Sequence, residues 1–194
     1  MNVLRSALLL PLLGAALAAQ ANFINFDDLA TTTNSGVSVG DSYLVSDGVS
    51  FLNGTALRSS TAPSAPNALF PDTATLTINS PSNVLITSVG LMYASTSVQT
   101  GATPTLNVYS GLSGAGTLLA TFALADTGSS ATYASVTLPF VGAARSFVLS
   151  DTASGRISYD NLSFTSQVQA APEPATLAAL GLGAAAMLRR RRKA

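Results

Sequence analysis

The sequence predicts an all-β protein, an antiparallel β-sandwich of jelly-roll-like topology, on three observations. Apolar and polar residues alternate with a period of two in several segments, for example over residues 74–79, and this alternation is the mark of a half-buried strand. Turn sequences rich in Gly, Ser, Asn and Pro separate these segments, and no helical period lies between them. The sequence has no internal repeat, which disfavours a propeller or a solenoid.

The predicted strands are short runs that present one apolar face. Ala134, Val136 and Leu138, for instance, share one face of their segment. In the last segment the alternation slips at Asp160-Asn161, which predicts a β-bulge. The predicted strands cover residues 23–26, 49–52, 74–79, 84–93, 105–109, 118–124, 134–138, 146–149 and 156–165.

The 194-residue chain divides into one domain and two processing segments. Residues 1–21 are predicted to be a signal peptide with an apolar helix, which signal peptidase would remove. Arg5 precedes the apolar stretch, and Ala19-Gln20-Ala21 fits a small-x-small cleavage site. Residues 22–168 are the predicted β-sandwich, which is long enough for one core and too short for two.

Composition excludes several classes of function for the predicted domain. Between residues 22 and 170, eight aspartates stand against three arginines, which gives a net charge of −5. Such a domain lacks the basic surface that nucleic-acid binding requires, so nucleic acid is not an expected partner. The chain has no cysteine and no histidine. Disulfides, Ser-His-Asp and Cys-His catalytic groups and histidine-ligated zinc are therefore excluded.

The C-terminal tail, residues 171–194, carries three features in a fixed order. Pro172-Glu173-Pro174 is followed by an apolar stretch over 175–188 and then by a basic cluster. The apolar stretch predicts a short transmembrane helix, and the basic cluster predicts a membrane stop on the cytoplasmic side. The members of the basic cluster are Arg189, Arg190, Arg191, Arg192 and Lys193.

Together these three features resemble the PEP-CTERM sorting signal. The resemblance implies that an exosortase recognises Pro172, Glu173 and Pro174 and removes the tail. It also implies a Gram-negative bacterium that makes extracellular polysaccharide. The expected location is the periplasm, the cell surface or the medium, with transient anchoring in the inner membrane by the C-terminal helix.

Two aspartate motifs bracket the predicted domain, Asp27-Asp28 near its start and Asp160 near its end. This pairing resembles extracellular jelly-roll modules, including carbohydrate-binding modules, in which acidic residues of the first and last strands approach a structural calcium ion. The resemblance implies that Asp27, Asp28 and Asp160 ligate calcium, which prefers six to eight oxygen ligands. Alternatively, these carboxylates are solvated or cap turns.

Three functions remain open at this point. A non-enzymatic component of the surface or of a polysaccharide (biofilm) matrix needs only export, sorting and a stable sandwich, so it ranks first. A carbohydrate-binding module ranks second, because tryptophan is absent and tyrosines would have to stack the sugar. A hydrolase ranks third, since it would need Asp27 or Asp28 across a cleft from Asp160. The candidate stacking residues are Tyr43, Tyr93, Tyr109, Tyr133 and Tyr159.

Overall fold

The computed structural model describes residues 19–32, 35–81, 84–95, 103–150 and 157–168. The described residues belong to one compact unit. The predicted signal helix and the predicted C-terminal helix lie outside them. Among the described residues, no helix is both long and apolar enough to cross a membrane.

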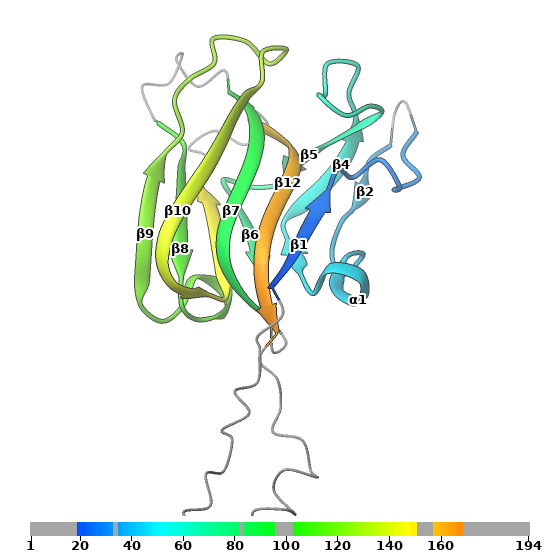
Figure 1. Ribbon diagram of the computed structural model, residues 1–194. Coiled ribbons are helices and arrows are strands. Elements are labelled where there is room, and N and C mark those ends of the chain that lie inside the picture. Colours follow the sequence, from blue (N-terminus) through cyan, green and yellow to red (C-terminus); the bar gives the residue numbers. More distant parts are fainter. Residues whose placement is uncertain (1–18, 33–34, 82–83, 96–102, 151–156, 169–194) are drawn as a thin grey trace, which may run out of the picture. The chain divides into compact units, whose positions relative to one another are not determined.

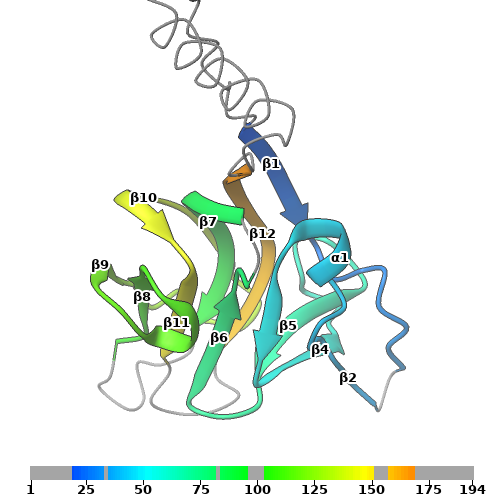
Figure 2. The same ribbon diagram turned by 90° about the horizontal axis from the view of Figure 1, so that it is seen from below.

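The described strands form two antiparallel sheets that pack face to face (Figures 1 and 2). One sheet has the order β10-β7-β12-β5-β4-β2, and β1 also pairs with β12. The other has the order β3-β6-β11-β8-β9. The first sheet consists of β1 (Ala19–Ile24), β2 (Val37–Ser38), β4 (Gly54–Arg58), β5 (Asn67–Pro71), β7 (Val84–Ser95), β10 (Ala134–Ala144) and β12 (Ile157–Val168). The second consists of β3 (Ser50–Leu52), β6 (Thr75–Asn79), β8 (Thr105–Tyr109), β9 (Leu118–Ala123) and β11 (Ser146–Ser150).

Strands β5 to β12 have the topology of a jelly roll. The order β5-β12-β7-β10 faces the order β6-β11-β8-β9, and the chain passes repeatedly from one sheet to the other. Strands β1 to β4 extend the two sheets. Within the described residues, two short helices, α1 (Leu44–Asp47) and η2 (Leu112–Gly114), lie in connections. The predicted all-β, jelly-roll-like sandwich is confirmed.

Every predicted strand overlaps an observed one, but β2, β4 and β5 were not predicted. Strand β5 has buried side chains on both faces, because Asn67, Ala68, Leu69 and Pro71 are all buried. Such a strand shows no alternation of apolar and polar residues, so the period-two criterion does not detect it.

The core lies between the two sheets and contains a cluster of three aromatic rings. Phe26, Tyr43 and Phe51 contact each other edge to face, with ring centroids 5.8 to 6.1 Å apart. Phe26 and Phe51 are fully buried, and each buried side chain of this size contributes about 2 kcal/mol of hydrophobic stabilisation. The cluster joins the segment after β1 to α1 and β3.

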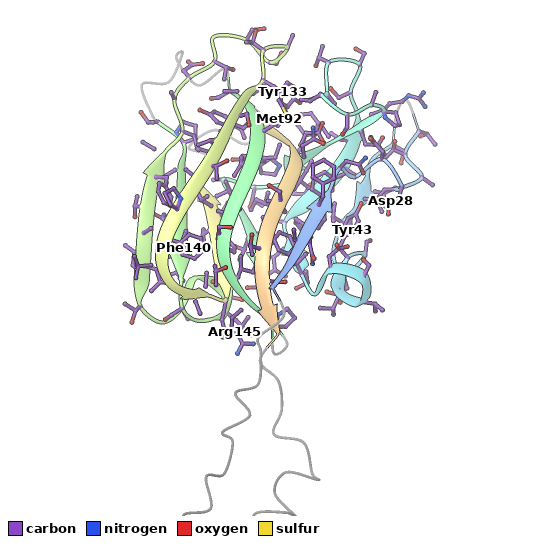
Figure 3. The ribbon with its side chains drawn as sticks, viewed as in Figure 1. Asp28, Tyr43, Met92, Tyr133, Phe140 and Arg145 are labelled. Atoms are coloured by element: carbon purple, nitrogen blue, oxygen red, sulfur yellow. The ribbon has the colours of Figure 1, made fainter. Side chains whose placement is uncertain are left out.

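Strand β12 runs along the sandwich and defines its two ends. Its last residues pair with the start of β1, with Ala19 opposite Gln167, so the described domain begins and finishes at the same end (Figure 1). Its first residues lie at the other end, where the hydroxyl of Ser158 contacts the hydroxyl of Tyr133 (Figure 3). From Asp160 to Val168 the strand extends about 26 Å at 3.3 Å per residue.

Candidate functional site

Strand β12 changes its neighbour at the predicted bulge. Tyr159 pairs with β5, whereas the strand pairs with β1 from Leu162 onward. Opposite β7 the register shifts between Asp160 and Ser163, and Asn161 adopts a positive φ of 50°. The bulge predicted from the slip in alternation is confirmed. It places Asp160 beside the gap between the end of β1 and the start of β5.

Asp160 fills this gap with a fully buried carboxylate. It is 0% exposed and accepts hydrogen bonds from the backbone N–H of Ser64 (2.8 Å), the hydroxyl of Ser64 (2.8 Å) and the N–H of Asn161 (2.7 Å). Burial raises the pKa of Asp160 above its usual value, and the negative charge of Asp27 adds to this rise. The hydrogen bonds from Ser64 and Asn161 lower the pKa and so oppose the rise. Where the pairing of β12 with its neighbouring strands is interrupted, the carboxylate oxygens thus take the place of backbone hydrogen-bond acceptors.

Asn67, the first residue of β5, anchors the turn after β1. Its side chain is 0% exposed and donates to the carbonyls of Phe26 and Leu29, each at 2.9 Å. Its backbone N–H donates to Asp27 Oδ1 at 2.9 Å, and Thr31 donates a hydroxyl hydrogen bond to its Oδ1. Phe26 has φ +64°, which is strained for a bulky side chain, and the bonds from Asn67 hold it there.

Asp28 points away from this network. Tyr43 donates its hydroxyl hydrogen bond to Asp28 Oδ1, and the two side chains approach each other beside α1 (Figure 3). Burial, together with the hydrogen bond to Asp28 and its negative charge, raises the pKa of Tyr43 well above its usual range. Asp28 therefore acts on the phenol of Tyr43 and is not joined to Asp160.

The three aspartates do not form the arrangement that the calcium prediction requires. Asp27 is close enough to Asp160 to raise its pKa, but Asp28 is engaged with Tyr43. Among the described residues, no three His, Cys, Asp or Glu side chains come close enough together to hold a metal ion. Both oxygens of Asp160 already accept hydrogen bonds from Ser64. The described side chains are not grouped as one three-carboxylate site, and calcium binding stays a prediction.

The network positions the β4–β5 loop, residues 59–66, beside a pocket of about 370 Å³. The bonds from Ser64 to Asp160 hold one side of the loop, and the backbone N–H of Ser59 donates to the carbonyl of Pro66 at 2.8 Å across its base. The pocket is lined by Arg58, Ser59, Ser60, Ala65 and Pro66.

The pocket combines a cation and hydroxyls with an apolar wall. Arg58 is exposed and offers a guanidinium with fixed donors, and Ser59 and Ser60 offer hydroxyls that donate and accept. Pro66 and Ala65 supply the apolar part of the wall. The pocket thus offers charged and neutral hydrogen-bond donors beside an apolar wall.

The pocket was not predicted from the sequence. Its only signal was Arg58, one of three basic residues between positions 22 and 170, followed by a loop of Ser, Thr, Ala and Pro. Nothing in the sequence showed that this loop is tied to Asp160, 96 positions away.

The tyrosines do not form an aromatic platform. Tyr43, Tyr93 and Tyr159 are at least 95% buried, and Tyr133 is half-buried with its hydroxyl 2.7 Å from that of Ser158 (Figure 3). A row of stacked sugars would need several exposed rings on one sheet face. Tyr109 is also only partly exposed, so the five candidate tyrosines do not provide such a row of exposed rings.

Residues 170–193 match the family of the PEP-CTERM protein-sorting motif. The tail is a PEP-CTERM sorting signal. The resemblance drawn from Pro172-Glu173-Pro174, the apolar stretch and the basic cluster is confirmed. The motif indicates an exported protein with a C-terminal sorting tail that anchors in the membrane, and it implies sorting to the surface by an exosortase. Residues 170–193 themselves lie outside the described residues.

The K2 cleaved adhesin domain of Lys-gingipain is similar to this chain in fold, with a TM-score of 0.51 and 11% identity over 75% of this chain and 99% of that domain. A carbohydrate-binding module of family 29 has a TM-score of 0.44 at 10% identity, over 77% of this chain and 90% of its own. The module CsCBM6-3 from Clostridium stercorarium, in complex with cellobiose, has a TM-score of 0.38 at 21% identity, over 74% and 92%. No curated protein sequence matches the chain.

Proposed function

We propose that this protein is a non-enzymatic component of the bacterial surface or extracellular matrix, which an exosortase sorts and which associates with exopolysaccharide or biofilm. The sorting motif over residues 170–193 is the observation that carries the proposal. Signal peptidase and exosortase are the processing partners, and the membrane holds the predicted C-terminal helix before processing.

Two features of the described residues support a non-enzymatic role. Asp160, the carboxylate that a glycosidase arrangement would need, is fully buried with donors on both oxygens. A substrate therefore has no access to it. The chain also has no histidine or cysteine to act as a base or a nucleophile.

The pocket beside the β4–β5 loop is the proposed contact with polysaccharide. It lies near the start of β12, whereas Ala19 and Val168 lie at the opposite end of the sandwich (Figure 1). The sorting tail is covalently attached after Val168, so the pocket end is the one farther from the attachment.

The sorting part is tested by the intact mass of the protein from its native host, with and without the exosortase gene. The expected result is loss of both ends in wild-type cells and retention of the tail when exosortase is absent. A tail that stays intact in wild-type cells would overturn the proposal and leave a membrane-anchored periplasmic domain.

The binding part is tested by titrating the mature protein with the host's purified exopolysaccharide. Arg58→Gln should weaken binding by about tenfold to a hundredfold, since a hydrogen bond to a charged group is worth about 1.5–3 kcal/mol. Arg145→Gln is the matched control, because it removes the same charge at the other end of the sandwich (Figure 3). Equal affinity of the wild type and Arg58→Gln would exclude this pocket as the contact.

The alternative function is a carbohydrate-binding module with a structural calcium at Asp27, Asp28 and Asp160. Thermal denaturation with added calcium and with a chelator tests it directly. A higher melting temperature with calcium, lost in Asp27→Asn, would favour the alternative.

A further inference from the structure

Strand β1 begins inside the segment that the sequence assigns to the signal peptide. Ala19, Gln20 and Ala21 pair with Gln167, Ser166 and Thr165 of β12. These are three of the six residue pairs between the two strands. Cleavage before Asn22 would therefore remove half of β1 from the mature domain.

Loss of these residues would leave part of β12 without a neighbour on one side. Over residues 165–167, β12 now has β7 on one side and β1 on the other. Ser166 within this stretch is 1% exposed. Without Ala19–Ala21, the backbone N–H and C=O groups of β12 over residues 165–167 would form an open sheet edge. Exported domains commonly avoid such an edge because it promotes aggregation.

Cleavage before Asn22 would also create a charged amine within the sheet. Asn22 lies in mid-strand opposite Phe164, which is 4% exposed, and the Asn22 side chain donates to the carbonyl of Asp47 at 2.9 Å. A new ammonium at this partly buried position would lose solvation. At Ala19 the amine would instead lie at the terminus of the strand.

A second cleavage motif lies immediately before β1. Ala16-Leu17-Ala18 has the same small-x-small pattern as Ala19-Gln20-Ala21, and Ala19 is the next residue. We propose that signal peptidase hydrolyses the peptide bond between Ala18 and Ala19. Water adds across this bond, so Ala18 leaves with the new carboxyl group and the mature chain begins with the free amine of Ala19.

The experiment is N-terminal sequencing of the full-length protein after export in its native host, together with its intact mass. The inference rests on the export that the proposed function requires, and the outcomes separate the two. Ala19 as first residue supports the inference. Asn22 as first residue overturns it and leaves export intact, whereas an unprocessed Met1 contradicts both.

Two variants of the full chain provide a matched pair. Ala18→Leu places a large side chain before the proposed bond and should remove the product that begins at Ala19. Ala21→Leu places the same side chain before the alternative bond, at an exposed position of β1, and should leave the Ala19 product unchanged. The reverse pattern, with processing lost in Ala21→Leu and retained in Ala18→Leu, would overturn the inference.

Discussion

Buried polar side chains hold two loops to the sandwich at its opposite ends, but a charge takes part in only one of these attachments. The β4–β5 loop is attached through the carboxylate of Asp160, which accepts hydrogen bonds from the backbone N–H and the hydroxyl of Ser64. The β8–β9 loop, residues 110–117, lies at the end marked by Arg145 and is attached through neutral side chains (Figure 3). Both loops are therefore held by buried hydrogen bonds, but only the β4–β5 loop is held by a charged group.

The neutral attachment uses one asparagine and one serine. Asn79 accepts a hydrogen bond from the backbone N–H of Ser113 at 2.7 Å. Ser146, which is 0% exposed, accepts from the N–H of Gly114 at 2.9 Å and donates to the carbonyl of Gly111 at 2.6 Å. These bonds hold a turn in which Ser113 has φ +55°.

We therefore expect the stability of the two loops to depend on conditions in different ways. A carboxylate makes stronger hydrogen bonds than an amide, but its burial carries a desolvation cost. The stability conferred by the charged attachment of the β4–β5 loop should be more sensitive to substitution and to pH. The stability conferred by the neutral attachment of the β8–β9 loop should respond less to both. The proposed binding pocket is beside the charged one.

Asp160→Asn should have the largest effect on stability. The asparagine amide would face the N–H donors of Ser64 and Asn161, so one buried donor loses its acceptor. We expect a loss of about 3 kcal/mol in the free energy of unfolding, measured by urea denaturation, since an unsatisfied buried donor costs 1–3 kcal/mol and a bond to charge is also lost.

Asp72→Asn is the control for this change, because Asp72 is exposed. Its free energy of unfolding should stay within about 0.5 kcal/mol of the wild type. If Asp160→Asn unfolds at the same urea concentration as Asp72→Asn, the carboxylate does not hold the loop, and the comparison between the two attachments fails.

Asn79→Ala should have a smaller effect, about 1–2 kcal/mol, because it removes neutral hydrogen bonds. The lost bonds involve Ser113, which is exposed, so water can replace part of them. Exopolysaccharide binding should stay unchanged in this variant, since the pocket is at the other end. A loss of binding with Asn79→Ala would show that the two ends are coupled.

The sequence revealed the architecture better than the site, for a physical reason. Period-two alternation marks strands with one buried face, and the slip at Asp160-Asn161 marked the bulge. Strand β5 was hidden because it is buried on both faces. The roles of Asp160 and Asn67 depend on contacts with Ser64 and Phe26 that join distant parts of the chain, and residue spacing does not encode such contacts.

The smallest expected effect is a pH dependence that belongs to only one of the two attachments. Burial raises the pKa of Asp160 in the folded state above its ordinary value of 3.8, with Asp27 adding to the rise. The folded state therefore binds this proton more tightly than the unfolded chain, and lowering the pH through the window between the two pKa values stabilises the wild type through Asp160.

Asparagine does not titrate, so the stability gap between the wild type and Asp160→Asn should widen as the pH falls through this window. The gap between the wild type and Asn79→Ala should stay constant, since the hydrogen-bond partner of the Asn79 side chain, Ser113, carries no titrating proton. Urea denaturation of the three proteins from pH 3 to pH 8 measures both gaps. A gap for Asp160→Asn that narrows with acid would mean that hydrogen bonding to the charged carboxylate outweighs its desolvation, and the loop would then be held best at neutral pH.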